Sequence, residues 1–221
     1  MPAVVSIAQR KGGAGKTTLT AHLAVSWAMA GQRVALVDID PQASLSGWFE
    51  LRRERLGAGN EGLGFASVSG WRMAVEVGRL AREHDIVLID SPPHAETEAR
   101  LAVRVANLVL VPMQPSPLDL WATRWTLELA SRAAVRTLVV LNRISARASL
   151  TAETIASLAE YPVGVARQAL GNRVAFPASM AIGLTALETR PVGEAAEEVR
   201  MLASELLATL YGDVVETAST T

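Results

Sequence analysis

The chain alternates short, uninterrupted apolar runs with longer segments in which apolar residues recur every three or four positions. Uninterrupted runs are typical of parallel strands covered on both faces, and the longer spacing is typical of helices with one buried side. The runs predict strands at 3–8, 33–38, 85–90, 107–112 and 136–141, with 63–68 as a further edge strand. Helices are expected at 18–30, 71–84, 96–106, 118–134 and 151–161. This order predicts an α/β fold with a doubly wound, mostly parallel sheet and a ligand site at the strand ends.

Composition agrees with one globular domain, expected over residues 1–213, with a disordered tail at 214–221. Half of the 221 residues are hydrophobic and 19% are charged, which excludes a disordered chain. No cysteine is present, so disulfides, thiolate metal sites and a cysteine nucleophile are excluded. The histidines are not spaced as metal ligands; they are His22, His84 and His94. Without a signal peptide or a membrane-length apolar run, the expected location is the cytoplasm.

A segment rich in glycine and lysine follows the first predicted strand. Of the 21 Lys and Arg residues only two are lysines, Lys11 and Lys16, and both lie in it. Residues 10–17 match the spacing Gly-x-x-x-x-Gly-Lys-Thr of a P-loop, with Arg10 in place of the first glycine. In such a loop Lys16 reaches the β- and γ-phosphates and the Thr17 hydroxyl holds Mg²⁺, while glycines let backbone N–H groups approach the phosphates. The residues expected to bind nucleotide in this segment are Lys11, Gly12, Gly13, Ala14, Gly15, Lys16, Thr17 and Thr18.

Acidic residues end two other predicted strands. Asp38 and Asp40 follow the strand at 33–38, and Asp90 ends the strand at 85–90. One carboxylate at the end of a buried strand, as at Asp90, is the Walker B arrangement that serves Mg²⁺. Asn142 follows the strand at 136–141, where it either hydrogen-bonds an adenine edge or is an ordinary turn residue. The sequence therefore predicts a Mg²⁺–nucleotide site, with Thr17, Asp38 and Asp90 near the metal.

These motifs together resemble the ParA/MinD family of dimerising ATPases. Residues 11–18 are similar to the deviant phosphate loop of that family, 38–42 to its first switch and 90–93 to its second. Segments 115–119, 172–177 and 183–188 are similar to short plasmid-partition ATPases, although the likeness weakens after residue 143.

The resemblance implies catalytic roles for Lys11, Lys16 and Asp40. Lys11 is similar to the signature lysine that crosses a homodimer to the partner's phosphates; the alternative is that it serves its own nucleotide. Asp40 corresponds to the residue that orients the attacking water, with Asp38 in support. ATP and Mg²⁺ are the implied cofactors.

The implied function is segregation of plasmid or chromosome DNA by an ATPase of the cytoplasm that associates with the nucleoid. The ATP-bound homodimer binds DNA non-specifically, and a ParB-like or cargo-adaptor protein stimulates hydrolysis. The net charge of −1 and pI near 6.3 do not indicate a strongly basic protein, so a local arginine patch is needed for DNA. The candidates are Arg143, Arg147, Arg167, Arg173, Arg190 and Arg200.

Three alternatives remain open: positioning of a protein cargo on the nucleoid, a MinD-like membrane cycle, and an ATP-dependent metabolic ligase. A membrane cycle requires a basic amphipathic helix at the C-terminal end. The apolar stripe of residues 199, 202, 206, 207 and 210 is followed by a segment without Lys or Arg, so we expect it to pack on the core, with no membrane partner.

Overall fold

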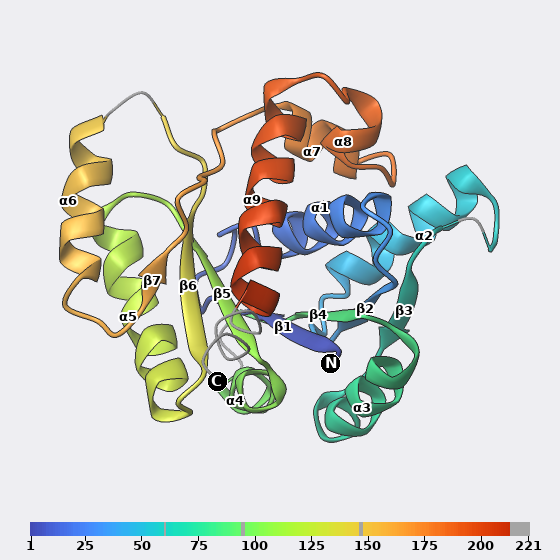
Figure 1. Cartoon of the computed structure of the whole chain (residues 1–221), viewed down its shortest axis with the longest axis horizontal. Helices are drawn as coiled ribbons and strands as arrows, with labels where there is room; N and C mark the ends of the chain where they lie inside the picture. Colours follow the sequence, from blue (N-terminus) through green and yellow to red (C-terminus); the bar gives the residue numbers. More distant parts are fainter. Residues whose placement is uncertain (60, 94–95, 146–147, 213–221) are drawn as a thin grey trace, which may run out of the picture.

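A seven-stranded parallel sheet forms the centre of the protein, in the order β3-β2-β4-β1-β5-β6-β7 (Figure 1). The computed structural model describes residues 1–59, 61–93, 96–145 and 148–212. Its strands are β1 Ala3–Ile7, β2 Val34–Asp38, β3 Gly64–Ser67, β4 Ile86–Asp90, β5 Leu108–Met113, β6 Arg136–Leu141 and β7 Gly164–Val165. The predicted fold class is confirmed, and the strand expected at 63–68 lies at an edge of the sheet.

Helices cover both faces of the sheet. On one face lie α1 Lys16–Met29, α2 Ser44–Leu56, α7 Ala175–Met180, α8 Ala186–Thr189 and α9 Glu194–Tyr211 (Figure 1). The other face carries the 3₁₀ turn η1 Gly70–Arg72 and the helices α3 Met73–Glu83, α4 Glu96–Val105, α5 Pro117–Arg132 and α6 Ala148–Leu158. In the described part of the chain no helix has the length and apolarity needed to cross a membrane.

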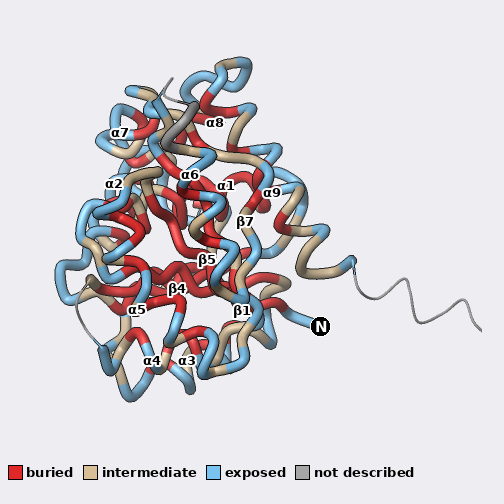
Figure 2. The backbone as a smooth tube through the Cα atoms, turned by 90° about the vertical axis from the view of Figure 1, so that its left-hand side faces the viewer, coloured by how far each residue is buried: buried red, intermediate tan, exposed pale blue. Residues whose placement is uncertain are grey.

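Successive side chains along each strand point to opposite faces of the sheet, so the core lies in separate parts on the two faces. Side chains such as Leu36 and Leu88 pack with α1 and α9, whereas their neighbours Val37 and Ile89 pack with α3. The central strands β1, β2, β4 and β5 are therefore buried along their whole length (Figure 2), which explains the uninterrupted apolar runs in the sequence.

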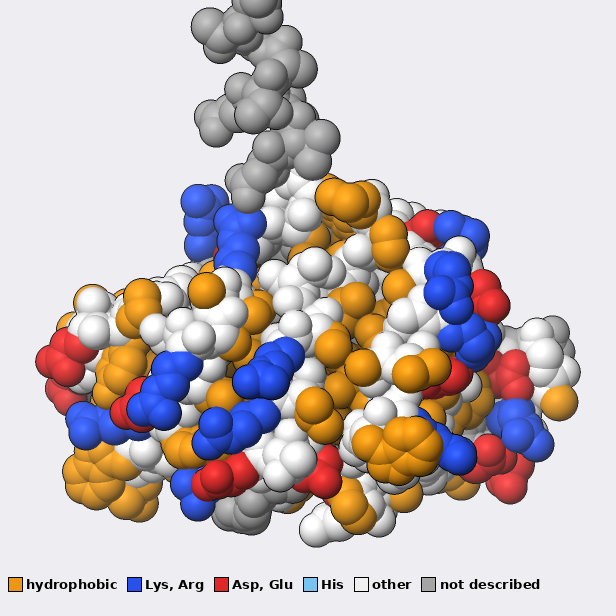
Figure 3. All heavy atoms as spheres, turned by 90° about the horizontal axis from the view of Figure 1, so that it is seen from below, with side chains coloured by type: hydrophobic (Ala, Val, Ile, Leu, Met, Phe, Trp, Pro, Cys, Tyr) orange, Lys and Arg blue, Asp and Glu red, His pale blue; other side chains and the backbone are white. Residues whose placement is uncertain are grey.

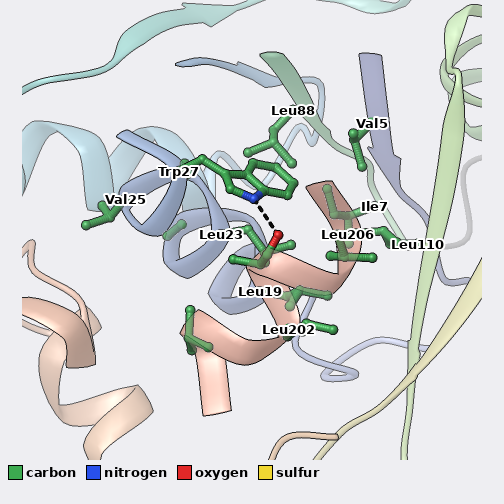
Figure 4. Packing of buried hydrophobic residues seen from close by; sticks show 14 of the residues in the cluster. Val5, Ile7, Leu19, Leu23, Val25, Trp27, Leu88, Leu110, Leu202 and Leu206 are labelled. Carbon is green, nitrogen blue, oxygen red and sulfur yellow. Dashed lines mark hydrogen bonds between the residues drawn. The ribbon is translucent and has the colours of Figure 1, made fainter. Parts of the chain in front are cut away.

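The indole of Trp27 lies in the larger part of the core. It is fully buried, and its Nε1–H donates to the carbonyl of Ala203 in α9 at 3.0 Å (Figure 4). The stripe expected to pack on the core does so: Leu202 and Leu206 are buried beside Leu19 and Leu23 of α1. The helix that starts at the glycine-rich loop is thus held by the C-terminal helix.

Several elements differ from the expectation. Helix α2 was not expected, nor were β7, α7 and α8. Helix α6 begins and ends three residues before the predicted 151–161, and α1 begins at Lys16 instead of residue 18. The tail predicted at 214–221 lies outside the described residues.

Candidate nucleotide-binding site

The three sequence motifs meet at one edge of the sheet. In the register of the strands Ile7 of β1 pairs with Asp90 of β4, and Asp90 pairs with Asp38 of β2. The glycine-rich loop leaves β1 at this level and leads directly into α1. The ends of three neighbouring strands therefore place the loop and both carboxylates at the position where parallel sheets bind ligands.

The loop has the shape of a phosphate cradle. Gly13 and Gly15 have φ of 71° and 95°, a region that side chains with a Cβ rarely adopt. In the part of the chain that the structure describes, no side chain caps the start of α1, so the N–H groups of its first turn are left for a ligand. An anion there is favoured both by these donors and by the helix dipole. The loop lines an open cleft of about 700 Å³ that also contains Asp40.

Lys16 and Thr17 both line this cleft. Lys16 is buried, and burial lowers its pKa, against the attraction of Asp90 and Asp40. The Thr17 hydroxyl donates to Oδ2 of Asp90 at 2.6 Å. A buried ammonium beside a threonine hydroxyl and a carboxylate is the arrangement that a Mg²⁺-bound phosphate chain requires.

Asp90 fits a metal-supporting role. It is buried, its Oδ1 has no hydrogen-bond partner among the described residues, and burial raises its pKa to about 7, with the nearby Asp38 adding to the rise. A divalent cation would relieve the cost of an unpaired buried carboxylate oxygen. Thr17 and Asp90 are therefore the residues that could hold Mg²⁺, and the ion would supply positive charge to the phosphates.

Asp38 instead holds the turn that contains Asp40. Its Oδ1 accepts from the backbone N–H of Asp40 at 3.0 Å. Its Oδ2 accepts from the N–H and the hydroxyl of Ser46 in α2, at 2.8 and 2.6 Å. Asp40 itself accepts from the N–H of Gln42 at 2.9 Å and faces the cleft. Asp38 thus lies beside Asp90 as expected, and in this state it fixes the segment that carries Asp40.

Lys11 points away from its own phosphate cradle. Its ammonium pairs with Asp119 of α5, a carboxylate that is 2% exposed. Asp119 also accepts from the Ser116 hydroxyl and from the N–H of Gln114. Lys11 does not line the described cleft, which extends from Gly12 onward. Arg10, which precedes Lys11 at the start of the loop, also contacts α5: its guanidinium lies 5.5 Å from the ring of Trp125.

Asn142 lies under the loop. Its Nδ2 donates to the carbonyl of Ala14 at 2.9 Å, and its Oδ1 accepts from the N–H of Arg143 at 2.9 Å. Beside it opens a second pocket of about 230 Å³, which shares Gly15 and Thr18 with the loop. The pocket has apolar walls, and its position next to the cradle suits the base of a nucleotide.

His22 supports this pocket from α1. The ring donates from Nδ1 to the carbonyl of Thr18 at 2.8 Å and accepts at Nε2 from the N–H of Ala186 at 3.0 Å. Burial lowers its pKa to about 4, so the ring is neutral. His84 lies elsewhere, on the carbonyl of Leu80, and His94 is outside the described residues.

The arginines expected to bind DNA do not form one common patch. Arg173 pairs with Glu194 and Glu198, and Arg143 lies between the two pockets. Arg167 and Arg200 line one groove beside α9. Arg190 precedes α9, and Arg147 falls outside the described residues.

Three site residues were missed from sequence. Ser46 donates from the first turn of α2 to Asp38, Asp119 pairs with Lys11, and His22 joins α1 to α8. In the sequence Asp119 is only the last residue of the segment 115–119 that resembles partition ATPases. No local pattern signals any of these contacts, because each partner is distant in sequence or belongs to another element.

Known proteins are similar to this chain in sequence and in fold. The family model described as "CobQ/CobB/MinD/ParA nucleotide binding domain" matches residues 5–185. Maintenance of carboxysome distribution protein A of Halothiobacillus neapolitanus is 28% identical over 211 residues, covering 92% of this chain and 95% of that protein. The chromosome-partitioning ATPase Soj of Thermus thermophilus is 27% identical, with the same coverage. The structure of the septum site-determining protein MinD of Pyrococcus horikoshii, in complex with Mg-ADP, superposes with a TM-score of 0.76 at 20% identity over the full length of both chains.

The fold and the site define the class of protein: it is a P-loop domain with a seven-stranded parallel sheet and a deviant phosphate loop. The chain belongs to the CobQ/CobB/MinD/ParA nucleotide-binding family. The match confirms the predicted family and with it the ATPase class, and it is consistent with ATP and Mg²⁺ as cofactors.

Proposed function

We propose that this protein is a ParA-type ATPase whose ATP-bound form is a homodimer that binds DNA without sequence preference. A partner protein bound to the cargo stimulates hydrolysis and releases the dimer, and repeated cycles move the cargo over the nucleoid in the cytoplasm. The proposal rests on Lys11. Its ammonium pairs with Asp119 on α5, outside its own cradle, and from there it can be transferred to the phosphates of a second copy.

The division of roles follows from the site. Lys16 neutralises the phosphates of its own subunit from a buried position, and Thr17 with Asp90 would hold Mg²⁺. Asp40 lies in the same cleft, on a turn that Asp38 holds, and is the residue we assign to the attacking water. Hydrolysis by the isolated subunit should be slow, because the trans charge of Lys11 is absent from it.

DNA contact is assigned to the groove beside α9. The face formed by α3, α4 and α5 carries basic and acidic side chains interspersed with apolar ones, so no large field of one sign covers it (Figure 3). The α9 groove is lined by three arginines, Arg136, Arg167 and Arg200. Arg200 pairs there with Glu197, an exposed pair that a phosphate can replace at little cost.

DNA binding tests this function directly. Binding to random-sequence duplex DNA is measured with ADP, with ATP and with ATP plus the Asp40→Ala change, at two salt concentrations. We expect ATP-dependent binding that weakens with salt and that the variant prolongs. Arg167→Ala should weaken it, and Arg132→Ala, at the exposed end of α5, is the matched control. Binding in no nucleotide state would contradict the DNA-dependent mechanism and leave the membrane cycle and the ligase to be tested.

The cargo can be a protein assembly instead of DNA. This second candidate is favoured by the similarity to the carboxysome-distribution protein, which extends over nearly the whole of both chains. The two cargoes are separated by asking which adaptor stimulates hydrolysis, one bound to a centromere-like DNA site or one bound to a protein body. The membrane cycle has less support, because the apolar stripe of α9 is buried.

A further inference from the structure

The end of β6 carries an asparagine whose amide is already engaged. Asn142 is 7% exposed; its Nδ2 donates to the carbonyl of Ala14, and its Oδ1 accepts from the next backbone N–H. The backbone of Asn142 is fixed as well, since its N–H donates to Met113 of β5 at 2.8 Å. The side chain therefore joins the rigid sheet to the glycine-rich loop.

Gly15 makes this contact possible. A Cβ at Gly15 would collide with the Nδ2 of Asn142, and the φ of 95° at Gly15 also disfavours any other residue. This glycine therefore leaves space for the asparagine amide as well as for a phosphate. The hydrogen bond from Asn142 holds the loop at the buried Ala14, directly before Gly15 and Lys16, whose N–H groups a phosphate would use.

A second asparagine lines the base pocket with its amide unengaged. Asn172 is exposed, and within the described part of the chain its side chain makes no hydrogen bond. Its position is nevertheless fixed by the backbone. Ile144 donates to Leu170 at 3.0 Å, and Asn172 donates back to Ile144 at 3.1 Å, so the segment 170–172 runs parallel to the end of β6.

The rest of the pocket offers mostly apolar surface. Leu19, Leu170, Phe176 and Pro177 line it, and Phe176 is held edge-on by the ring of His22 at 5.1 Å. Apolar walls take up a planar base but distinguish adenine from guanine poorly. An amide distinguishes them, because it accepts from N6 and donates to N7 of adenine, whereas guanine presents two acceptors on that edge.

We propose that the two asparagines divide the work: Asn142 is a positioning residue for the phosphate loop, and Asn172 reads the base and favours adenine. The inference rests on the proposed function, since it concerns the nucleotide of the same site. It assigns ATP specificity to the segment after β7 instead of to the end of β6.

Three ligands separate these roles by binding alone. Affinities for ATP, GTP and tripolyphosphate, each with Mg²⁺, are measured by calorimetry on the full chain. Asn142→Ala should weaken all three by the same factor, about tenfold, because it loosens the loop. Asn172→Ala should leave tripolyphosphate within about twofold of the wild type. It should weaken ATP about tenfold and bring ATP and GTP close together.

A matched control accounts for any general loss of stability. Asn107 accepts from the N–H of Val4 at 2.7 Å, at the opposite ends of the strands. Asn107→Ala should lower the melting temperature and leave the ratios among the three ligands unchanged. If Asn142→Ala lowers the affinity for all three ligands by one factor and leaves their ratios unchanged, the result supports the role of Asn142 in positioning the loop.

Two results would overturn the inference. If Asn142→Ala weakened ATP and spared tripolyphosphate, Asn142 would read the base. If Asn172→Ala bound ATP as the wild type does, Asn172 would have no part in recognition. Failure of the wild-type chain to bind any of the three ligands would instead overturn the proposed function, so the two failures are distinguishable.

Discussion

Replacing His22 should remove a large part of the pH dependence of folding. In the folded chain the ring is neutral, with Nδ1–H donated to Thr18 and Nε2 accepting from Ala186. Burial is the main reason why the pKa falls from 6.5 to about 4, and a second ring proton at Nε2 would also replace the hydrogen bond from the N–H of Ala186. The unfolded chain binds that proton freely below its ordinary pKa. Stability from this group is therefore full above pH 6.5 and decreases as the pH falls toward 4.

The size of the effect follows from the two pKa values of His22. One pKa unit corresponds to about 1.4 kcal/mol, so the full shift corresponds to about 3 kcal/mol. Between pH 7 and pH 5 about 2 kcal/mol of it should be lost, since the unfolded ring is then almost wholly protonated and the folded ring is not. Asp90 contributes in the opposite direction, because its raised pKa of about 7 costs stability as the pH rises. A comparison of two variants at each pH cancels that contribution.

The assay is urea unfolding of the nucleotide-free wild type and of His22→Gln at pH 7, 6 and 5. Glutamine cannot donate to Thr18 and accept from Ala186 with the geometry of the ring, so the variant is less stable at pH 7. Its deficit should shrink by about 2 kcal/mol at pH 5. A deficit that stayed constant across this range would refute the neutral, doubly hydrogen-bonded ring.

Three further changes have defined outcomes. Gly183→Ala should cost about 3 kcal/mol in urea unfolding, because φ is +72° and the new Cβ would strike the backbone of α2. Gly31→Ala, where φ is +86° and no described residue comes within 4 Å of the new Cβ, should cost about 1 kcal/mol. Equal costs would contradict the close approach. Trp27→Phe should cost about 2 kcal/mol through a lost hydrogen bond and a small cavity, and a change below about 0.5 kcal/mol would contradict the bond. Asp119→Asn should release Lys11 and lower the protein concentration needed for the ATP-dependent dimer about fivefold, measured by sedimentation; an unchanged dimer would count against the pairing as a restraint.

The sheet and the phosphate loop could be predicted because their signals are local. Continuous apolar runs are enough to identify buried parallel strands, and the loop spacing places Lys16 and Thr17 where a strand meets a helix. Helix α2 could not be recognised in this way. It contains Gly47, its N-cap is Ala43 in a left-handed conformation, and in its first turn the N–H of Ser46 donates to Asp38 at the end of β2. The start of α2 is stabilised by a tertiary contact, so its own sequence gives little indication that a helix begins there.

Helix α8 is a different case, since it carries a readable signal that was missed. Thr185 and Glu188 form a capping box, in which the threonine begins the helix and the glutamate returns to the Thr185 N–H at 2.8 Å. The helix has only four residues, and such a length is too short for a hydrophobic period to appear. Its contribution to the site, the N–H of Ala186 on His22, is visible only in three dimensions.

The pairing of Lys11 with Asp119 has a consequence for the proposed dimer. A lysine that reaches a second subunit must first leave a buried carboxylate, and that separation costs several kcal/mol if nothing replaces the ammonium. The phosphates of the partner subunit offer Lys11 an alternative anion, while the Ser116 hydroxyl and the N–H of Gln114 remain as donors to Asp119. The exchange is therefore favourable only when a highly charged nucleotide is present across the interface. On this reasoning the ion pair opposes dimerisation without ATP, and its strength sets how strictly the dimer depends on the nucleotide.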